Sequence, residues 1–419
     1  MRIAIVGSGI SGLTCAHYLH PHHDIEVFEA GDWIGGHTHT LDIDIQGKNY
    51  AVDTGFIVFN HHTYPNFLKL LSEVGADYQE SCMSFSVFCE RTGLEYNATS
   101  IDTLFAQRSN ILKPKFWKML KDIYRFYKEA DGILASGDQR SLGQFLKDED
   151  YSQPFIDQHI VPMAAAVWSA PPSQMMSFPL EYLLRFFHNH GFTKLAGRPQ
   201  WYVMKGGSRE YVRKLVKPFE DKIHLNTPVQ SIKRYQDHVE LNVGGKLEQF
   251  DEVIIACHSD TALEILSDST DTEKDILSNI PYQANEVILH TDASIMPKKK
   301  KAWASWNYRL PKGEARDATV TYWMNKLQGF KDGPQFLVSL NQGQDIAPDK
   351  ILATFQYDHP VYTRETVHAQ ERYSEIGSGR THFCGAYWHY GFHEDGVKSA
   401  LRVCDVITRK TKRESTKAA

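Results

Sequence analysis

Residues 1–30, MRIAIVGSGISGLTCAHYLHPHHDIEVFEA, decide the fold of this chain. Ile3–Val6 predicts a short buried strand, and three glycines follow it in the spacing G-x-G-x-x-G. The next residues predict a helix, and a second strand, Ile25–Phe28, ends in Glu29. This order of strand, glycine turn, helix, strand and acid is that of the βαβ unit that binds a dinucleotide.

The three glycines are Gly7, Gly9 and Gly12, and each has a physical role. Gly7 permits the tight turn from strand to helix, Gly9 lets a pyrophosphate approach the backbone, and Gly12 lets the helix pack closely on the strand. The N–H groups at the start of the helix can donate to phosphate oxygens. Glu29 can accept hydrogen bonds from ribose hydroxyls, which favours FAD or NAD over NADP. The residues predicted to contact the cofactor here are Gly7, Gly9, Ile10, Ser11, Gly12, Glu29 and Ala30.

The composition of the whole chain is that of a globular protein large enough for two domains. It has 419 residues, of which 42% are hydrophobic and 23% charged, and its net charge of −5 predicts no nucleic-acid partner. The six cysteines form no C-x-x-C pair and no run of about 18 apolar residues occurs, so we expect a cytoplasmic protein with reduced thiols. The histidines match no metal-ligand motif, and no metal site is predicted.

Further segments, together with the first thirty residues, resemble the flavin amine oxidase superfamily, which includes monoamine oxidases, protoporphyrinogen oxidases and phytoene-type desaturases. Gly35-Gly36 is followed by His37, where the superfamily usually has arginine. Asp53–Ile57 is similar to the segment that runs along the flavin ring, and Thr227-Pro228-Val229 is similar to a turn whose valine contacts the adenine region. The buried strand that ends at Ala256 resembles the strand that precedes the superfamily's crossing near the cofactor.

The C-terminal segment Thr381–Val403 completes the resemblance. Gly385-Ala386 stands where the superfamily usually has Gly-Glu or Gly-Asp. A helix is expected to begin at Asp395-Gly396-Val397 with Asp395 as its N-cap, and the resemblance implies that its positive end points at the flavin, where it would favour the reduced ring. The resemblance therefore adds to the predicted cofactor site the residues Gly35, Gly36, His37, Thr38, Gly55, Phe56, Val229, Ala256, Gly385, Gly396 and Val397.

These pieces predict an α/β fold with a discontinuous cofactor domain. Residues 1–60, 195–260 and 380–410 are expected to form a Rossmann-like FAD-binding domain with a parallel sheet. Residues 61–194 and 261–379 are expected to form a mixed α+β substrate domain, and residues 411–419 a disordered tail. No second G-x-G-x-x-G follows a strand, so a separate NADPH site is not predicted.

Two segments of the substrate domain bear on its partners. Residues 154–192 are rich in methionine and aromatic residues, and together they predict an apolar small-molecule or lipid substrate, although such residues taken singly pack in cores. Residues 111–130 predict a basic amphipathic helix. This pattern is typical of a half-buried helix with a solvated face, and it also fits peripheral contact with an anionic membrane through residues 113–130. The sequence predicts no oligomeric state.

The function expected from the resemblance is that of an FAD-dependent oxidoreductase. A hydride would pass from an apolar substrate C–H or an amine C–H to flavin N5, with FAD held non-covalently. A desaturase-like role on a fatty acyl or other lipidic substrate is one interpretation, and an amine oxidase is another. A non-redox flavoenzyme such as a mutase, or a dinucleotide-binding protein without catalysis, is a third. No motif identifies the catalytic residues; the candidates are Trp306, Trp388 and Tyr390, with Trp303 and Trp306 expected on one strand face as a wall above the flavin.

Overall fold

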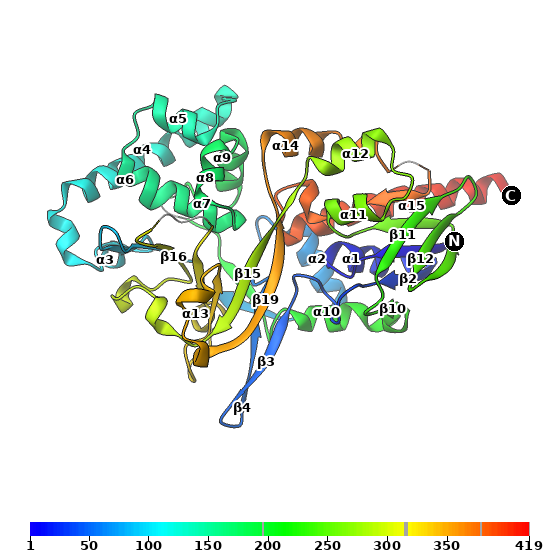
Figure 1. Cartoon of the computed structure of the whole chain (residues 1–419), viewed down its shortest axis with the longest axis horizontal. Helices are drawn as coiled ribbons and strands as arrows, with labels where there is room; N and C mark the ends of the chain where they lie inside the picture. The colour runs from blue at the N-terminus through cyan, green and yellow to red at the C-terminus, as the bar shows by residue number, and fades with distance from the viewer. Residues whose placement is uncertain (195–196, 314–316, 378, 419) are drawn as a thin grey trace.

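The computed structural model describes residues 1–194, 197–313, 317–377 and 379–418. The described chain forms two regions that lie side by side (Figure 1). One region holds a parallel sheet close to the N-terminus, and the other holds a larger mixed sheet with a cluster of helices at its far end. This arrangement confirms the predicted α/β fold with a cofactor domain and a mixed substrate domain.

The parallel sheet has the strand order β10-β2-β1-β14-β20, and every pair in it is parallel. Its strands come from three distant parts of the chain: β1 (Arg2–Val6), β2 (Asp24–Phe28), β10 (Ile223–His224), β14 (Glu252–Ile255) and β20 (Thr381–Phe383). Alternate residues of β1 face two separate cores, because side chains alternate along a strand. Ile3 and Ile5 pack with helices α1 (Ile10–Leu19) and α15 (His393–Ala418), whereas Ala4 and Val6 pack on the opposite face.

The mixed sheet of the second region has the order β19-β15-β18-β17-β16-β7-β8. Its strands are β7 (Phe85–Cys89), β8 (Leu94–Asn97), β15 (Tyr282–His290), β16 (Trp306–Leu310), β17 (Val320–Trp323), β18 (Leu337–Leu340) and β19 (Ile351–Pro360). The smaller sheets are a hairpin of β3 (Thr40–Ile45) and β4 (Lys48–Asp53), the set β5 (Val58–Asn60), β9 (Trp201–Met204) and β6 (Tyr78–Ser81), and the set β11 (Val229–Arg234), β12 (Val239–Val243) and β13 (Lys246–Phe250).

The helices fall into two groups. Those of the substrate region are α3 (Ile101–Leu104), α4 (Pro114–Ser136), α5 (Leu142–Asp148), α6 (Gln153–Phe155), α7 (Val161–Trp168), α8 (Pro172–Ser177), α9 (Leu180–Asn189) and α13 (Met324–Gln328). The others are α2 (Pro65–Val74), α10 (Arg209–Val216), α11 (Ser259–Ile265), α12 (Asp271–Ser278) and α14 (Arg364–Glu371). Short 3₁₀ turns are η1 (Arg108–Leu112), η3 (Lys217–Lys222), η4 (Ala293–Ile295), η5 (Lys300–Ala302), η6 (Gly343–Asp345), η7 (Pro348–Lys350), η8 (Tyr373–Glu375) and η9 (Ala386–Trp388).

Helix α4 contains most of the predicted amphipathic segment 111–130. Pro114 starts the helix, where its missing N–H costs nothing, and Gly137 ends it in a left-handed conformation with φ of 65°. Phe116, Met119 and Phe126 are buried at helical spacing. The helix therefore packs one apolar face and leaves the lysine-rich face exposed.

A turn of π-helix, η2 (Ile156–Ile160), connects α6 to α7, and Pro162 explains it. Proline has no N–H to give to the carbonyl four residues earlier, which is that of Gln158. The hydroxyl of Tyr96 on β8 donates to this carbonyl at 2.8 Å. A side chain from the sheet thus takes the place of the missing helical hydrogen bond.

The division into domains stays a prediction, but the cores show where three of the helices pack. Residues 61–194 and 261–379 were assigned to the substrate domain, yet three of their helices pack on the cores beside the parallel sheet. Phe67 and Leu70 of α2 share a core with Ile3, and Ile276 of α12 and Ala369 of α14 share the opposite core. The apolar faces of these three helices are short, and their hydrophobic pattern in the sequence does not differ from that of helices in the other region.

Three local expectations differ from the structure. Residues 411–419 were expected to be disordered, but α15 continues to Ala418, and Ala419 lies outside the described residues. Helix α15 begins at His393 and not at Asp395, so Asp395 is the third helical residue and not the N-cap. Strand β16 begins at Trp306, and Trp303 lies before it with its Nε1 donating to the carbonyl of Pro297 at 2.7 Å. The two tryptophans are three residues apart and do not share a strand face.

Candidate cofactor and substrate site

The glycines of the first loop differ in what surrounds them. Gly7 has φ of +103°, and a Cβ on Gly12 would lie 1.9 Å from the carbonyl oxygen of Gly7, so the fold itself requires both glycines. A Cβ on Gly9 would meet nothing within 4 Å. The space at Gly9 is therefore open, at the N-terminus of α1, where free N–H groups suit a pyrophosphate.

The second glycine pair lies directly against this loop, as the resemblance implied. Gly9 and Gly35 form a parallel bridge, and a Cβ on Gly36 would lie 3.2 Å from the Cα of Gly9. Trp33 donates from Nε1 to the carbonyl of Gly36 at 2.9 Å. Two loops thus form one backbone-lined wall around the open space.

Glu29 joins the first loop to the end of β2. Its Oε2 accepts from the backbone N–H of Ser8 at 2.8 Å and from the Ser8 hydroxyl at 2.6 Å, and its Oε1 accepts from the N–H of Gly31 at 2.8 Å. A carboxylate has about four lone-pair sites, so it can still accept from a ribose. The N–H of Thr227 donates to the Glu29 carbonyl at 2.8 Å, which brings the turn before the buried Val229 to the same place. Ala30, in contrast, is exposed.

His37 occupies the position of the usual arginine, and its side chain is half-buried with Nε2 shielded from solvent. Its Nε2 has no hydrogen-bond partner, and burial together with His359, His258 and His393 holds its pKa well below the ordinary value. Its ring centroid lies 5.1 Å from that of Tyr357 and 5.3 Å from that of His359. An unpaired buried imidazole nitrogen at this wall fits a polar ligand that supplies the missing partner.

The segment Asp53–Ile57 packs against His37 from the other side. A Cβ on Gly55 would lie 2.1 Å from the carbonyl oxygen of His37, so only glycine is accommodated. Phe56 stacks on His393 with ring centroids 3.6 Å apart and planes at 7°. Nε2 of His393 lies 3.1 Å from the Thr38 hydroxyl and 2.7 Å from that of Tyr211, and burial lowers the pKa of His393 to about 3. The structure therefore brings together Thr38, Phe56 and the start of α15.

The start of α15 crosses the start of α1. The Ser11 hydroxyl donates to the carbonyl of Gly396 at 3.1 Å, and a Cβ on Gly396 would lie 2.7 Å from Cγ2 of Ile10. Val397, the next residue, is fully buried in the core beneath. Asp395 accepts from the N–H of Phe392, the residue before the helix, at 3.0 Å, so its carboxylate reaches back past the helix start, and burial raises its pKa to about 7.

The remaining predicted contacts lie in the loop before α15 and just after β14. The N–H of Gly385 donates to the Ser399 hydroxyl at 3.2 Å, and a Cβ on Gly385 would lie 2.2 Å from the ring of Tyr387. Ala256, at the end of β14, has its carbonyl oxygen 3.1 Å from the place of a Cβ on Gly7. The Sγ atoms of Cys384 and Cys15 lie 3.9 Å apart within the core, which agrees with FAD held without a covalent bond.

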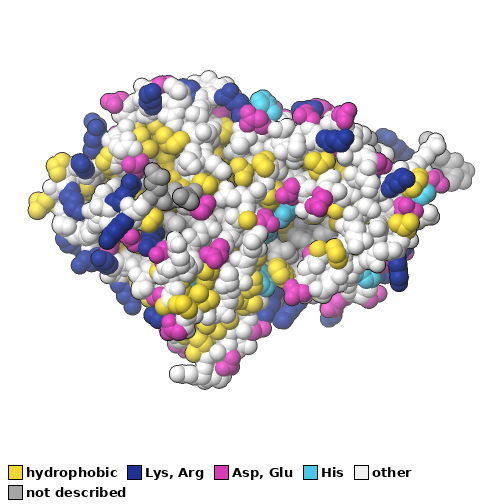
Figure 2. All heavy atoms as spheres, viewed as in Figure 1, with side chains coloured by type: hydrophobic (Ala, Val, Ile, Leu, Met, Phe, Trp, Pro, Cys, Tyr) yellow, Lys and Arg dark blue, Asp and Glu magenta, His cyan; other side chains and the backbone are white. Residues whose placement is uncertain are grey.

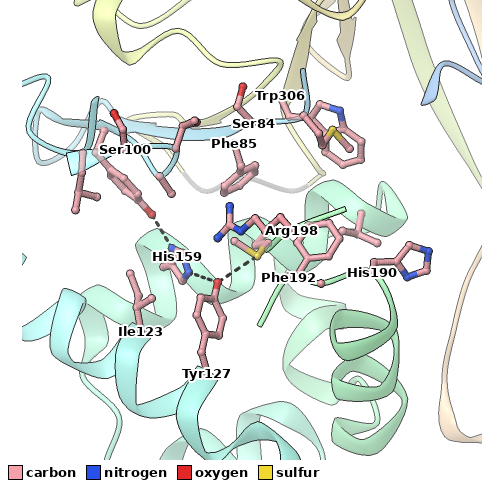
Figure 3. A pocket seen from close by; sticks show the side chains of 18 of the residues that line it. Ser84, Phe85, Ser100, Ile123, Tyr127, His159, His190, Phe192, Arg198 and Trp306 are labelled. Carbon is pink, nitrogen blue, oxygen red and sulfur yellow. Dashed lines mark hydrogen bonds between the residues drawn. The ribbon is translucent and has the colours of Figure 1, made fainter. Parts of the chain in front are cut away.

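A cavity of about 340 Å³ lies between the mixed sheet, helices α3, α4 and α7, and residues that follow α9 (Figure 3). This volume is within the range of about 300–1,000 Å³ that is usual for small-molecule sites. One end adjoins the start of α15, because His190 in its lining lies 5.8 Å from Phe392 between ring centroids. Its lining is Met83, Ser84, Phe85, Tyr96, Ala98, Thr99, Ser100, Leu104, Leu120, Ile123, Tyr124, Tyr127, His159, Met163, Val167, His190, Gly191, Phe192, Arg198, Pro199, Trp201 and Trp306.

The other end of the cavity carries a chain of hydrogen bonds around His159. Nδ1 and Nε2 of His159 each lie 2.9 Å from a tyrosine hydroxyl, of Tyr96 and Tyr127 respectively. Because Tyr96 donates to the carbonyl of Gln158, it accepts from Nδ1–H, and Nε2 is left to accept from Tyr127. Burial, and secondarily Arg198, lower the pKa of His159 to about 3, so the imidazole is neutral.

Arg198 supplies a positive charge at this end. Its guanidinium reaches between Phe85 and His159 (Figure 3). Nε donates to the carbonyl of Lys194 at 2.9 Å, and the side chain forms no ion pair with a carboxylate of the described residues. The Arg198 side chain is itself exposed, so the cavity is apolar along its length with one solvent-exposed cation at this end.

The three catalytic candidates lie in different surroundings. Trp306 lines the cavity. Trp388 is buried in the core beside the parallel sheet, 4.8 Å from Tyr373 between ring centroids, and Tyr390 packs on Tyr182 at 4.6 Å. Neither of these two residues belongs to the cavity lining.

Several residues of the site were not predicted from the sequence. His258 comes three residues after the end of β14, so its place near the cofactor strand offered a weak signal. His359 and Tyr357 come from β19, and Arg198 and His159 from segments without a motif. Only the tertiary packing of the mixed sheet on the cofactor domain brings them to the site.

A discontinuous parallel sheet, a glycine-walled phosphate site and an adjoining apolar cavity define a dinucleotide-dependent oxidoreductase fold. The chain belongs to the family of flavin-containing amine oxidoreductases, whose family model matches residues 10–331. It is therefore an FAD-dependent oxidoreductase. No curated protein sequence matches the chain.

Solved structures with the same fold cover almost the whole chain. Cyclohexylamine oxidase from Brevibacterium oxydans IH-35A is 16% identical, with a TM-score of 0.71 over 98% of this chain and 99% of that one. Putrescine oxidase bound to putrescine is 13% identical, with a TM-score of 0.69 over 98% and 99%. A CLA-producing fatty acid isomerase from P. acnes is 16% identical, with a TM-score of 0.62 over 97% and 98%. At these identities the likeness establishes the fold.

Neither a metal-ligand cluster nor a membrane-spanning helix occurs among the described residues. No three His, Cys, Asp or Glu side chains there converge as the ligands of a metal ion would. None of the helices in that part of the chain combines the length and apolar character that a membrane span requires.

Proposed function

We propose that this oxidoreductase acts on an acyl chain that carries a free carboxylate, in a desaturase-like reaction. The observation that carries the proposal is the cavity beside the start of α15, which is lined by aliphatic and aromatic side chains. Its lining includes the exposed Arg198, which pairs with no carboxylate of the described residues. The apolar lining suits a hydrocarbon chain, and the guanidinium suits a carboxylate because its fork of N–H donors matches the two oxygens.

The same lining disfavours an amine substrate. An ammonium group in an apolar cavity needs a carboxylate or another source of negative charge. No Asp or Glu occurs among the lining residues, and Arg198 and a protonated amine would repel each other. The charge of the cavity therefore favours an acid over the amines that two of the structures of the same fold oxidise.

One set of residues in this chain would hold the cofactor, and another would hold the substrate. When bound, FAD would supply a two-electron acceptor for a hydride from one substrate carbon, and the neighbouring carbon would lose a proton to solvent as the double bond forms. Gly9, Gly36 and Gly55 would lie along the cofactor, with Glu29 at its ribose and His37 as a hydrogen-bond partner. Arg198 holds the carboxylate at the end away from α15, and the aromatic lining excludes water and directs the hydrocarbon toward the cofactor domain.

A second candidate is a flavoenzyme without net oxidation, such as an isomerase or a mutase. A fatty acid isomerase shares the fold, and an acyl chain in this cavity suits that activity as well. A sugar-nucleotide mutase is less suitable, because a diphosphate needs more than one arginine and the cavity has Arg198 alone.

The test compares three ligands that share one hydrocarbon chain and differ in the head group. Decanoic acid, its methyl ester and decylamine are each mixed anaerobically with the holoenzyme, and absorbance near the flavin maximum is followed. We expect the acid to bleach the flavin and the other two to do so far more slowly. Rapid bleaching by decylamine alone would contradict the proposal. Conversion of an unsaturated acid to an isomer without bleaching would identify the second candidate.

Two variants test whether Arg198 binds the carboxylate of the substrate. Arg198→Gln should weaken the apparent affinity for decanoic acid at least tenfold, since a charge-assisted pair is lost. Arg185→Gln is the matched control, because Arg185 is an exposed arginine on α9 outside the cavity lining. If Arg198→Gln bound the acid as the parent does, Arg198 would not be the anchor.

A further inference from the structure

We propose that one end of the molecule, formed by α3, η1 and the first part of α4, binds the surface of an anionic membrane. We define this α3–α4 surface by its exposed apolar residues and its exposed lysines. They are Ile101, Ile111, Leu112, Trp117 and Tyr124, and Lys115, Lys118, Lys121 and Lys128. The proposal concerns where the protein acts and does not depend on the proposed substrate.

Exposed apolar side chains are concentrated on this surface. Nine large hydrophobic side chains are exposed in the described chain, and five of them lie between residues 101 and 124. Leu112 is 85% exposed, Ile101 79% and Trp117 50%. Single exposed apolar residues are ordinary, whereas a group of five in one short stretch indicates an interaction surface.

Positive charge surrounds these apolar residues. Residues 101–128 contain seven lysines and arginines and two aspartates, in a chain whose net charge is −5. The two aspartates are already engaged: Asp102 pairs with Lys301 at 2.6 Å and with Arg108, and buried Asp122 accepts from the N–H of Ser152 at 3.0 Å. Lys115, Lys118, Lys121 and Lys128 form no ion pair with any carboxylate in the described part of the chain. Their charge is therefore available to an external anion.

The arrangement along α4 suits a lipid surface better than a protein. Trp117, Lys121, Tyr124 and Lys128 follow one another at intervals of four, three and four residues, so aromatic and cationic side chains alternate along one line of the helix. Aromatic rings at the headgroup level and lysines facing anionic lipid are typical of helices that lie on membranes. Lysine is depleted in protein–protein interfaces, which argues against a protein partner.

The elements beside the α3–α4 surface add further lysines to it. The run Lys298–Lys301 leads into η5, which contacts α3. Lys and Arg side chains gather with hydrophobic ones at the left end of the molecule in Figure 2, where Figure 1 places α3 and α4. Leu104, Leu120 and Tyr124 also line the cavity, so the surface and the cavity share a wall. A membrane bound here would lie beside the cavity.

The test measures binding of the full-length holoenzyme to lipid vesicles by co-sedimentation. Vesicles of phosphatidylcholine alone are compared with vesicles of phosphatidylcholine and phosphatidylglycerol in equal parts, at low and at high salt. We expect binding to the anionic vesicles at low salt, and at least tenfold weaker binding to phosphatidylcholine alone and at high salt, because surface charges are screened.

Two variants and their controls identify the surface. Leu112→Asp removes the most exposed apolar side chain, and the triple variant Lys115→Glu/Lys118→Glu/Lys121→Glu reverses the charge. Each should weaken binding to anionic vesicles at least tenfold and leave flavin content unchanged. Leu247→Asp and Lys246→Glu, on the distant strand β13, should bind as the parent does.

The opposite results would overturn the proposal. Failure of the parent to bind anionic vesicles, or binding of the α3–α4 variants equal to that of the parent, would exclude this surface as a lipid contact. A parent that forms dimers in solution, with dimers lost in Leu112→Asp and no vesicle binding, would instead assign the surface to a second copy of the chain.

Discussion

Single residues of the cofactor site divide into those that local sequence predicts and those that it does not. Gly12 and Gly55 leave no room for a Cβ against the backbone of their own neighbourhood, so a short motif is enough to identify them. Asp395 was predicted as the N-cap of α15, but it is the third residue of the helix, three positions further on. The carboxylate reaches back to the N–H of Phe392, and helix ends depend on such contacts rather than on pattern.

The burial of Asp395 makes a prediction about pH. Its pKa is raised to about 7, whereas the unfolded chain has about 3.9. The folded state thus binds this proton more tightly, and stability from this group falls as pH rises from about 4 to about 7. The Asn side chain in Asp395→Asn does not titrate. The free energy of unfolding of the variant minus that of the parent should therefore rise over this pH range, by at most about 4 kcal/mol. FAD content should change little.

The measurement is urea unfolding of parent and variant holoprotein at several pH values. Asp53, whose pKa burial raises to about 6, titrates in both proteins and cancels in the difference. Asp405→Asn provides a control on the same helix, because Asp405 is exposed. A stability difference that stayed constant from pH 4 to pH 8 would show that Asp395 is not a buried acid.

At the scale of elements, Tyr96 links a strand to an irregular helix. Its hydroxyl donates to the carbonyl that Pro162 leaves without a helical partner, and it accepts from His159. Tyr96→Phe would leave both groups buried and unpaired, so we expect the free energy of unfolding to fall by about 1–3 kcal/mol. Urea unfolding measures the loss. Tyr235→Phe, at an exposed tyrosine, should change stability by far less.

The close crossing of α1 and α15 at Gly396 predicts the effect of a larger side chain at this position. A leucine at Gly396 would press on Ile10 and Ser11, at the N–H groups expected to receive the cofactor. Gly396→Leu should therefore lower FAD content per protein, measured by flavin absorbance after gel filtration. Gly132→Leu on α4 is the matched control, since a Cβ there meets nothing within 4 Å. Full FAD content in Gly396→Leu would exclude this helix from the cofactor site.

For the whole molecule, the sequence predicted the cofactor domain far better than the substrate site. Strand, glycine loop and acid follow one another between Ile3 and Glu29, so a local pattern contains the information. His359, His159 and Arg198 lie on elements that reach the site only when the mixed sheet packs on the cofactor domain. Helix α2 shares a core with Ile3 of the parallel sheet, and its apolar face alone does not specify which sheet it will cover.

The order of the parallel sheet has a consequence for biosynthesis. Its edge strand β20 and the helix α15 come from residues 381–418, while the first glycine loop is made within the first twelve residues. A ribosome-bound chain that stops short of residue 381 has the loop without the helix that crosses it at Gly396. The cofactor site therefore cannot be completed before residues 381–418 have been synthesised, and until then the nascent chain is a precursor that cannot close around FAD.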